Sequence, residues 1–118
     1  MVIEFKNMLP DLTMNERFLV AFMSGIGEEL FFRGLLLPLS GLLISTILFG
    51  GIHYPVKKYM KIWTIFALIM GFLLGILCEK TNSILFPILA HILVNFIGFN
   101  IINSIKNRKN YSKKESAI

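Results

Sequence analysis

A charged cluster interrupts an otherwise apolar stretch in the first half of the chain. Glu28, Glu29 and Arg33 are the only charged residues between positions 18 and 49. Because an ionised group at the centre of a bilayer costs a few kcal/mol, such residues usually pair or face a cavity. Glu29 and Arg33 are four residues apart, so on a helix they can form an ion pair. Glu28 lies about 100° around the helix without such a partner, which makes it a candidate for chemistry.

Three further polar side chains stand in apolar stretches. His53 ends a short apolar run, and His91 and Asn95 lie one turn apart on another, hence on one face of a helix. A single histidine in a membrane helix most often makes an interhelical hydrogen bond. Two histidines, an unpaired glutamate and an amide are together costly unless they meet in a water-filled cavity.

Such a cavity would support hydrolysis. A carboxylate and an imidazole beside one water molecule can take its proton as it attacks a carbonyl group. An amide N–H and a second imidazole can donate to the oxyanion that then develops. Ser24 lies about a turn from Glu28, while Ser40 and Ser45 lie away from it. Attack by water is therefore favoured over attack by a serine.

A metal site is the alternative use of the same groups. Glu28, His53 and His91 match the two histidines and one carboxylate of many zinc sites. However, the chain has no His-Glu-x-x-His motif, and three separate helices would have to supply the ligands. We therefore expect no cofactor, with zinc as the alternative.

The composition indicates one membrane-embedded, all-α domain. Of the 118 residues, 55% are hydrophobic and only 16% are charged, whereas soluble domains carry about 25% charged residues. The mean hydropathy is +0.70. We see no cleavable signal peptide after Met1, and the single cysteine, Cys78, cannot form an internal disulfide. The expected location is the cell membrane, as a multi-pass protein.

The apolar runs predict four helices of a transmembrane bundle. Their expected ranges are 13–38, 41–54, 61–78 and 84–104. Thr13 and Glu16 form a capping-box pattern at the start, and Pro38, Ser40 and Gly41 are expected to separate the first two helices. The second run is short for a full span. This reading gives an amphiphilic N-terminal stretch (1–12), a membrane core (13–104) and a basic cytoplasmic tail (105–118).

The basic residues predict the orientation. Lys80 alone falls on one side of the predicted bundle, and the other loop and terminal cations fall on the opposite side: Lys6, Arg17, Lys57, Lys58, Lys61, Lys106, Arg108, Lys109, Lys113 and Lys114. The positive-inside rule then places both termini in the cytoplasm. The tail is expected to be attracted to anionic lipid. We do not expect nucleic-acid binding, because no aromatic residues interleave these charges.

The polar motifs, in this order, resemble those of the CPBP intramembrane proteases. This family of CAAX-processing and bacteriocin-processing proteins, also called the Abi domain, includes the type II CAAX prenyl endopeptidases. The resemblance spans residues 18–99 and rests on three motifs: Glu28-Glu29-x-x-x-Arg33, Phe49-x-x-x-His53 and His91-x-x-x-Asn95. It implies an endopeptidase acting on a prenylated or other membrane-associated protein, or on a bacteriocin-type peptide.

The resemblance also implies a role for each residue. Glu28 and His53 match the pair that activates water, and His91 and Asn95 match the pair proposed to form the oxyanion hole. The remaining motif residues match supporting positions: Glu29, Arg33 and Phe49, the last packing beside the first histidine.

The chain departs from the family in two respects. Members usually carry several more transmembrane helices ahead of the acidic motif, so helices of a partner or of a second copy could complete this core. Gly25 and Gly27 stand where a proline often does, and they permit close helix approach. The competing functions are a non-catalytic binding or immunity protein, a truncated inactive fragment, and a transporter subunit that relays protons.

Overall fold

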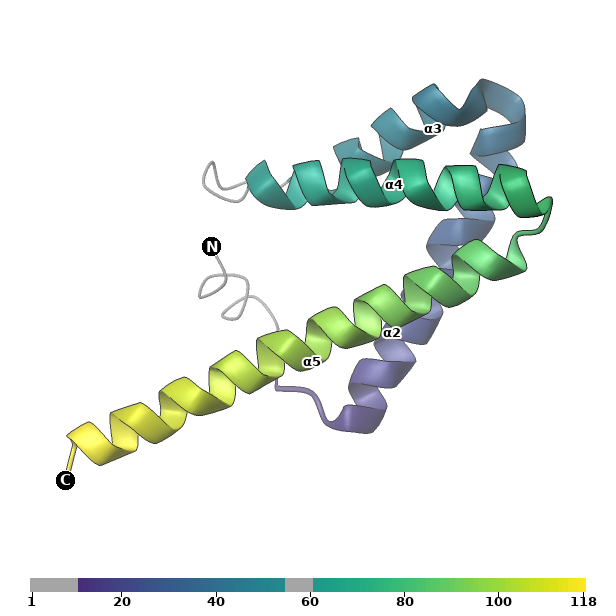
Figure 1. Ribbon diagram of the computed structural model, residues 1–118. Helices are drawn as coiled ribbons and strands as arrows, with labels where there is room; N and C mark the ends of the chain where they lie inside the picture. Colours follow the sequence, from purple (N-terminus) through teal and green to yellow (C-terminus); the bar gives the residue numbers. More distant parts are fainter. Residues whose placement is uncertain (1–10, 55–60) are drawn as a thin grey trace.

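Helices make up all the regular structure in the part of the chain that the computed structural model describes, residues 11–54 and 61–118. In chain order they are α2 (Met14–Glu29), the π-helix η1 (Leu30–Leu36), α3 (Leu37–Ile52), α4 (Lys61–Thr81) and α5 (Leu85–Ser116). Figure 1 shows α3 and α4 side by side, and α2 crossing α5. The predicted all-α membrane bundle is confirmed, since three segments are long and apolar enough to span a bilayer: Met14–Ile52, Lys61–Thr81 and Leu85–Ser116.

The first of these segments replaces two of the four expected helices. Pro38 does not end a helix but occupies the first turn of α3, where its missing N–H costs little. Within Met14–Ile52 the non-helical residue is Gly41, with φ 84° and ψ 171°. Glycine adopts a positive φ without steric cost. The chain therefore reverses direction at Gly41, and this turn lies at the same end of the molecule as the turn between α4 and α5 (Figure 1).

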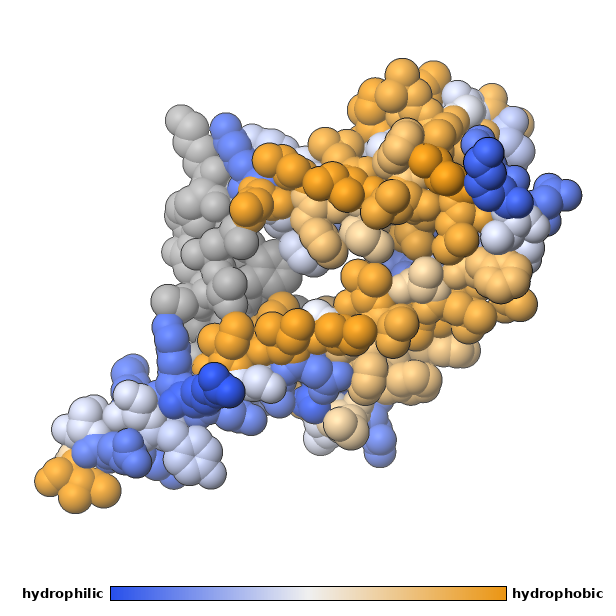
Figure 2. Space-filling view, viewed as in Figure 1, coloured by the Kyte–Doolittle hydropathy of each residue, from blue (hydrophilic) through white to orange (hydrophobic). Residues whose placement is uncertain are grey.

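The start of α2 agrees with the boundary predicted from the sequence, whereas the end of α5 differs from the predicted one. Thr13 and Glu16 form the expected capping box, with side chain to backbone distances of 2.7 and 3.3 Å. α5 continues to Ser116 rather than ending near 104, because residues 99–118 contain neither Gly nor Pro. The basic tail is thus largely the continuation of α5, and hydrophilic residues gather there in Figure 2. Residues 1–10 and the loop carrying Lys57 and Lys58 lie outside the described ranges.

The buried core is small, as expected for helices whose outer faces meet lipid. Hydrophobic residues cover much of the helix surface in Figure 2. The core cluster consists of Phe32, Phe49 and Ala67. Four glycines leave room for side chains of a neighbouring helix, because a β-carbon would lie within 3.0 Å of one at Gly25, Gly50, Gly71 and Gly75. A β-carbon on Gly71, for example, would lie 2.8 Å from the Phe49 ring. At Gly27 the expected close approach is absent, because a β-carbon there would meet no atom of a neighbouring described residue within 4 Å.

Candidate active site

Three helix segments position the polar residues. α2 ends with Glu28 and Glu29, His53 directly follows α3, and α5 carries His91 and Asn95. Directly after the two glutamates the helix changes to the π-helix η1, a form that occurs often at functional sites. The Ser45 hydroxyl on α3 donates to the carbonyl of Phe32 within η1 at 3.1 Å, which ties η1 to α3.

Glu28 faces both histidines. Its Oε2 atom lies 3.6 Å from His53 Nε2 and 3.7 Å from His91 Nε2. These separations exceed a direct hydrogen bond and suit groups that share one water molecule. The Glu28 side chain is 28% exposed, yet Oε2 is buried and makes no hydrogen bond within the described ranges. The carboxylate of Glu28 is therefore oriented toward the two imidazoles, and its Oε2 is free to accept a hydrogen bond.

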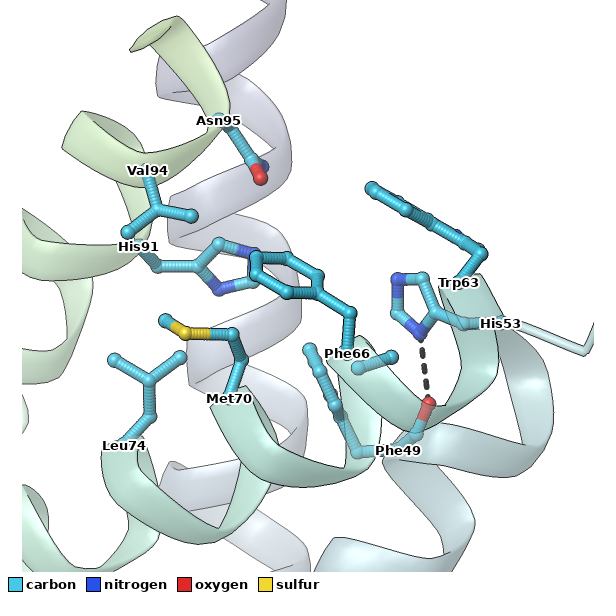
Figure 3. Close-up of a pocket in the computed structure, with 10 residues that line it drawn as sticks. Phe49, His53, Trp63, Phe66, Met70, Leu74, His91, Val94 and Asn95 are labelled. Atoms are coloured by element: carbon cyan, nitrogen blue, oxygen red, sulfur yellow. Dashed lines mark hydrogen bonds between the residues drawn. The ribbon is translucent and has the colours of Figure 1, made fainter. Parts of the chain in front are cut away.

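The tautomer of His53 follows from its own backbone contact. His53 Nδ1 lies 2.7 Å from the carbonyl oxygen of Phe49, the dashed line in Figure 3. Since a carbonyl oxygen only accepts, Nδ1 carries the hydrogen, and Nε2 of the neutral ring is an acceptor. Two acceptors, His53 Nε2 and Glu28 Oε2, thus face each other across 3.6 Å.

His91 is held by the second glutamate. Its side chain is 6% exposed, and Nδ1 lies 2.6 Å from Glu29 Oε1. The carboxylate accepts, so Nδ1 carries a hydrogen and Nε2 is directed to Glu28. The sequence did not indicate this contact, because spacing within one helix reveals Glu29–Arg33 but not a partner 62 residues away.

Arg33 is buried with its partner. Nη1 donates to Glu29 Oε1 at 2.9 Å, and Nη2 donates to the Gly71 carbonyl on α4 at 2.6 Å. The guanidinium also lies over the Phe49 ring, with Cζ 4.6 Å from its centroid. The exposed fractions of the two side chains are 1% for Arg33 and 0% for Glu29. Glu29 therefore connects Arg33 on its own helical segment to His91 on α5.

Phe49 packs against both histidines. Its ring centroid is 4.6 Å from that of His53 and 5.8 Å from that of His91. It also meets Phe32 edge to face at 5.0 Å. The packing beside His53 was expected, whereas the contacts with His91 and Arg33 come from α5 and η1. The Phe49 ring thus provides an apolar surface that contacts both imidazoles.

Asn95 completes the set on the wall opposite His53 (Figure 3). Its Nδ2 donates to Ser24 Oγ on α2 at 3.0 Å. A cavity of about 250 Å³ joins these groups to Glu28, and its lining is otherwise mainly apolar: Val20, Ser24, Glu28, His53, Trp63, Phe66, Val94, Asn95, Gly98, Phe99 and Ile102.

Three lining residues escaped the sequence reasoning. For Ser24 the sequence does carry a signal, because its spacing of four residues from Glu28 places it on the same helix face. Trp63 and Phe66 stack on each other with centroids 5.6 Å apart and form the α4 side of the site. Nothing in the apolar pattern of α4 distinguished them from lipid-facing residues.

The zinc alternative needs Glu28, His53 and His91 as ligands. Among residues 11–54 and 61–118, no group of three or more His, Cys, Asp or Glu side chains is placed to hold a metal ion. Glu28, His53 and Asn95 line the cavity, and the His91 imidazole lies next to it, with Nε2 3.7 Å from Glu28 Oε2.

The chain matches known proteins across this site. It is 31% identical over 81 residues to the "Uncharacterized protein YpbD" of Bacillus subtilis (strain 168), a match that covers 67% of this chain and 39% of that relative. No solved structure matches. Residues 12–97 match the family described as "Type II CAAX prenyl endopeptidase Rce1-like". This range contains every residue of the polar site and confirms the resemblance carried by the three motifs. The chain belongs to the type II CAAX prenyl endopeptidase Rce1-like family.

Proposed function

We propose that this chain is an intramembrane endopeptidase in which Glu28 and His53 activate a water molecule. The observation that carries the proposal is the pair of proton acceptors, Glu28 Oε2 and His53 Nε2, 3.6 Å apart at the cavity wall. One water between them would donate a hydrogen to each and direct a lone pair at a peptide carbonyl. As the oxygen–carbon bond forms, the water's proton passes to Glu28.

The developing oxyanion would be stabilised from the α5 side. With Nδ1–H bonded to Glu29, His91 would donate from Nε2 when that nitrogen also carries a hydrogen. Asn95 has a second amide N–H besides the one bonded to serine, and it would be the other donor. When the C–N bond breaks, Glu28 returns its proton to the leaving amine, and the other product is a carboxylic acid, whose proton then passes to the released amine or to water.

The cavity favours a substrate that is itself membrane-associated. Its walls carry Val20, Phe66, Val94, Phe99 and Ile102 beside the polar groups, and they belong to membrane-spanning segments. An apolar segment can therefore be buried next to Glu28. Since the family is described by CAAX prenyl endopeptidases, the proposed substrate is a protein ending in a prenylated Cys-a-a-X sequence. A bacteriocin-type peptide is the second substrate that the same cavity would accept.

A fluorogenic peptide tests the proposal. The 118-residue chain, reconstituted in liposomes, is given a farnesylated Cys-a-a-X peptide with a quencher on the C-terminal side, and released tripeptide is identified by mass spectrometry. Glu28→Gln keeps the size of the side chain but removes the base, so the rate should fall about 10²–10⁴-fold. Glu79→Gln, at an exposed position of α4 outside this cavity, is the matched control and should cleave like wild type.

The contrary result is equally clear. If folded Glu28→Gln protein released tripeptide as fast as wild type, water activation at Glu28 would be wrong. Absence of cleavage by wild type of both the farnesylated peptide and a bacteriocin-type leader peptide would favour the non-catalytic binding or immunity function. The same peptide without the farnesyl group measures how much of the rate depends on the apolar chain.

A further inference from the structure

Ser24 is the polar residue of the cavity that the proposed mechanism does not use. It lies on α2 one turn before Glu28, and its side chain is half-buried. Its Oγ donates to the Ala21 carbonyl at 3.3 Å and accepts from Asn95 Nδ2 at 3.0 Å. Ser24 therefore connects the backbone of α2 to the amide on α5.

The direction of these two hydrogen bonds decides which end of the amide meets the hydroxyl. A serine hydroxyl has one hydrogen and two lone pairs. Because the hydrogen is given to Ala21, the oxygen presents lone pairs to Asn95 and selects Nδ2 over Oδ1. An amide rotated by 180° would place a carbonyl oxygen where an N–H is needed, and that oxygen would repel an oxyanion.

The same contacts argue against Ser24 as a nucleophile. Its hydrogen is bonded to a backbone carbonyl, which cannot act as a base, rather than to Glu28 or a histidine. Ser40 provides a contrast. Its hydroxyl also donates to a backbone carbonyl, that of Leu36 at 2.7 Å, but Ser40 does not line the cavity. A backbone contact alone is thus common to both serines, and the bond to Asn95 distinguishes Ser24.

We propose that Ser24 is a positioning residue that fixes the carboxamide of Asn95 with an N–H toward the oxyanion. This inference rests on the proposed endopeptidase function. Ser24 touches no reacting atom in this account, and its effect on the rate passes through Asn95. The consequence is a transition-state effect, so substitution at Ser24 should lower kcat and leave KM unchanged.

A double-mutant cycle on the farnesylated peptide tests the coupling. Ser24→Ala should lower kcat about 10–100-fold, as removal of an orienting group does at other sites. Asn95→Ala should lower it about 10²–10³-fold, and the double variant should be no slower than Asn95→Ala. Ser24→Thr, which keeps the hydroxyl, should restore most of the rate. Ser40→Ala is the control and should match wild type.

Additive losses in the cycle, or wild-type kcat for Ser24→Ala beside an inactive Glu28→Gln, would overturn the role of Ser24 and leave the endopeptidase function intact. If Ser24→Ala fails to accumulate, Ser24→Cys replaces it, because sulfur is a weak acceptor of nearly the same size. The same loss of kcat is then expected, and full activity of Ser24→Cys would contradict the proposal.

A spectroscopic readout separates this proposal from the function on which it rests. In nanodiscs, ¹⁵N-asparagine-labelled protein should show a carboxamide signal that Asn95→Gln removes. Ser24→Ala should shift that signal, and Ser40→Ala should not. An unshifted signal would mean that the two side chains do not interact, and the proposal would be wrong. A shifted signal without any Glu28-dependent cleavage would make the contact structural, and both proposals would fail.

Discussion

Replacing Glu29 by Gln should destabilise the protein, whereas the same change at the adjacent Glu28 should not. Glu29 is fully buried, and its Oε1 accepts from Arg33 Nη1 at 2.9 Å and from His91 Nδ1 at 2.6 Å. The change removes the negative charge, and the acceptors left to Arg33 are the Gly71 carbonyl and the amide oxygen of the new Gln, both neutral. An arginine with an exposed fraction of 3% is then left without a counter-charge.

The size of the effect follows from this burial. Removing one member of a buried ion pair costs about 3–5 kcal/mol, because the remaining charge stays desolvated. Gln retains one carbonyl acceptor, so we expect the lower end, about 3 kcal/mol, or roughly 100-fold in the folding equilibrium. This is a large share of a total stability of about 5–15 kcal/mol. Glu28 is 28% exposed and contacts its neighbours at 3.6 and 3.7 Å, so Glu28→Gln should change stability by under about 0.5 kcal/mol.

The assay uses the fluorescence of Trp63, the only tryptophan, during unfolding of the purified protein in mixed micelles with increasing SDS. Glu29→Gln should unfold at a lower SDS fraction than wild type, and Glu28→Gln at the same fraction. The variant Glu29→Gln/Arg33→Leu removes both charges and should recover part of the loss, since apolar replacement of a whole buried pair is often neutral. A wild-type midpoint for Glu29→Gln, or no recovery in the double variant, would refute the reasoning.

Four further results are expected. Reporter fusions after Asn82 and after Lys114 should report the outside and the cytoplasm, respectively; a cytoplasmic Asn82 would reverse the orientation. Asn95→Ala should retain a residual rate about 10²–10³-fold below wild type. Complete loss of peptide release by a folded variant would mean that Asn95 donates more than one hydrogen bond to the oxyanion. Gly98→Leu should raise KM for the farnesylated peptide, because Gly98 lines the cavity and a β-carbon there meets no atom within 4 Å. A zinc chelator should leave peptide release unchanged, and zinc-reversible inhibition would revive the metal mechanism.

The sequence predicted the membrane helices, although not all of their ends, and it singled out the polar residues of the cluster. Runs of apolar residues predict membrane helices because each backbone must satisfy its own hydrogen bonds in lipid. The ion pair of Glu29 and Arg33 could be predicted because it forms within one turn of helical chain. Isolated polar residues in such runs, His53 and His91 among them, are conspicuous because an apolar surrounding makes them costly.

The connections between helices could not be predicted in this way. Whether Gly41 turns the chain or Pro38 ends a helix depends on how α3 packs on α4, which local spacing does not encode. The residues of the π-helix η1 do not differ in type from those of an α-helix, so its sequence does not reveal it. Its Phe32 carbonyl accepts a hydrogen bond from Ser45 on another helix. Contacts between chain segments far apart in sequence are fixed by tertiary packing, so they had to be observed.

The two adjacent glutamates show how packing gives identical side chains different chemistry. One residue on a helix turns the side chain by about 100°, which points Glu29 to Arg33 and His91 and Glu28 to the cavity. Glu29, with two donors and no exposure, is a fixed negative charge that orients His91. Glu28 meets an acceptor nitrogen of His53 and is partly open, which suits the proton transfer proposed for it. Exchanging these environments would place a carboxylate that already accepts two hydrogen bonds at the cavity, and an exposed carboxylate could not compensate a buried arginine.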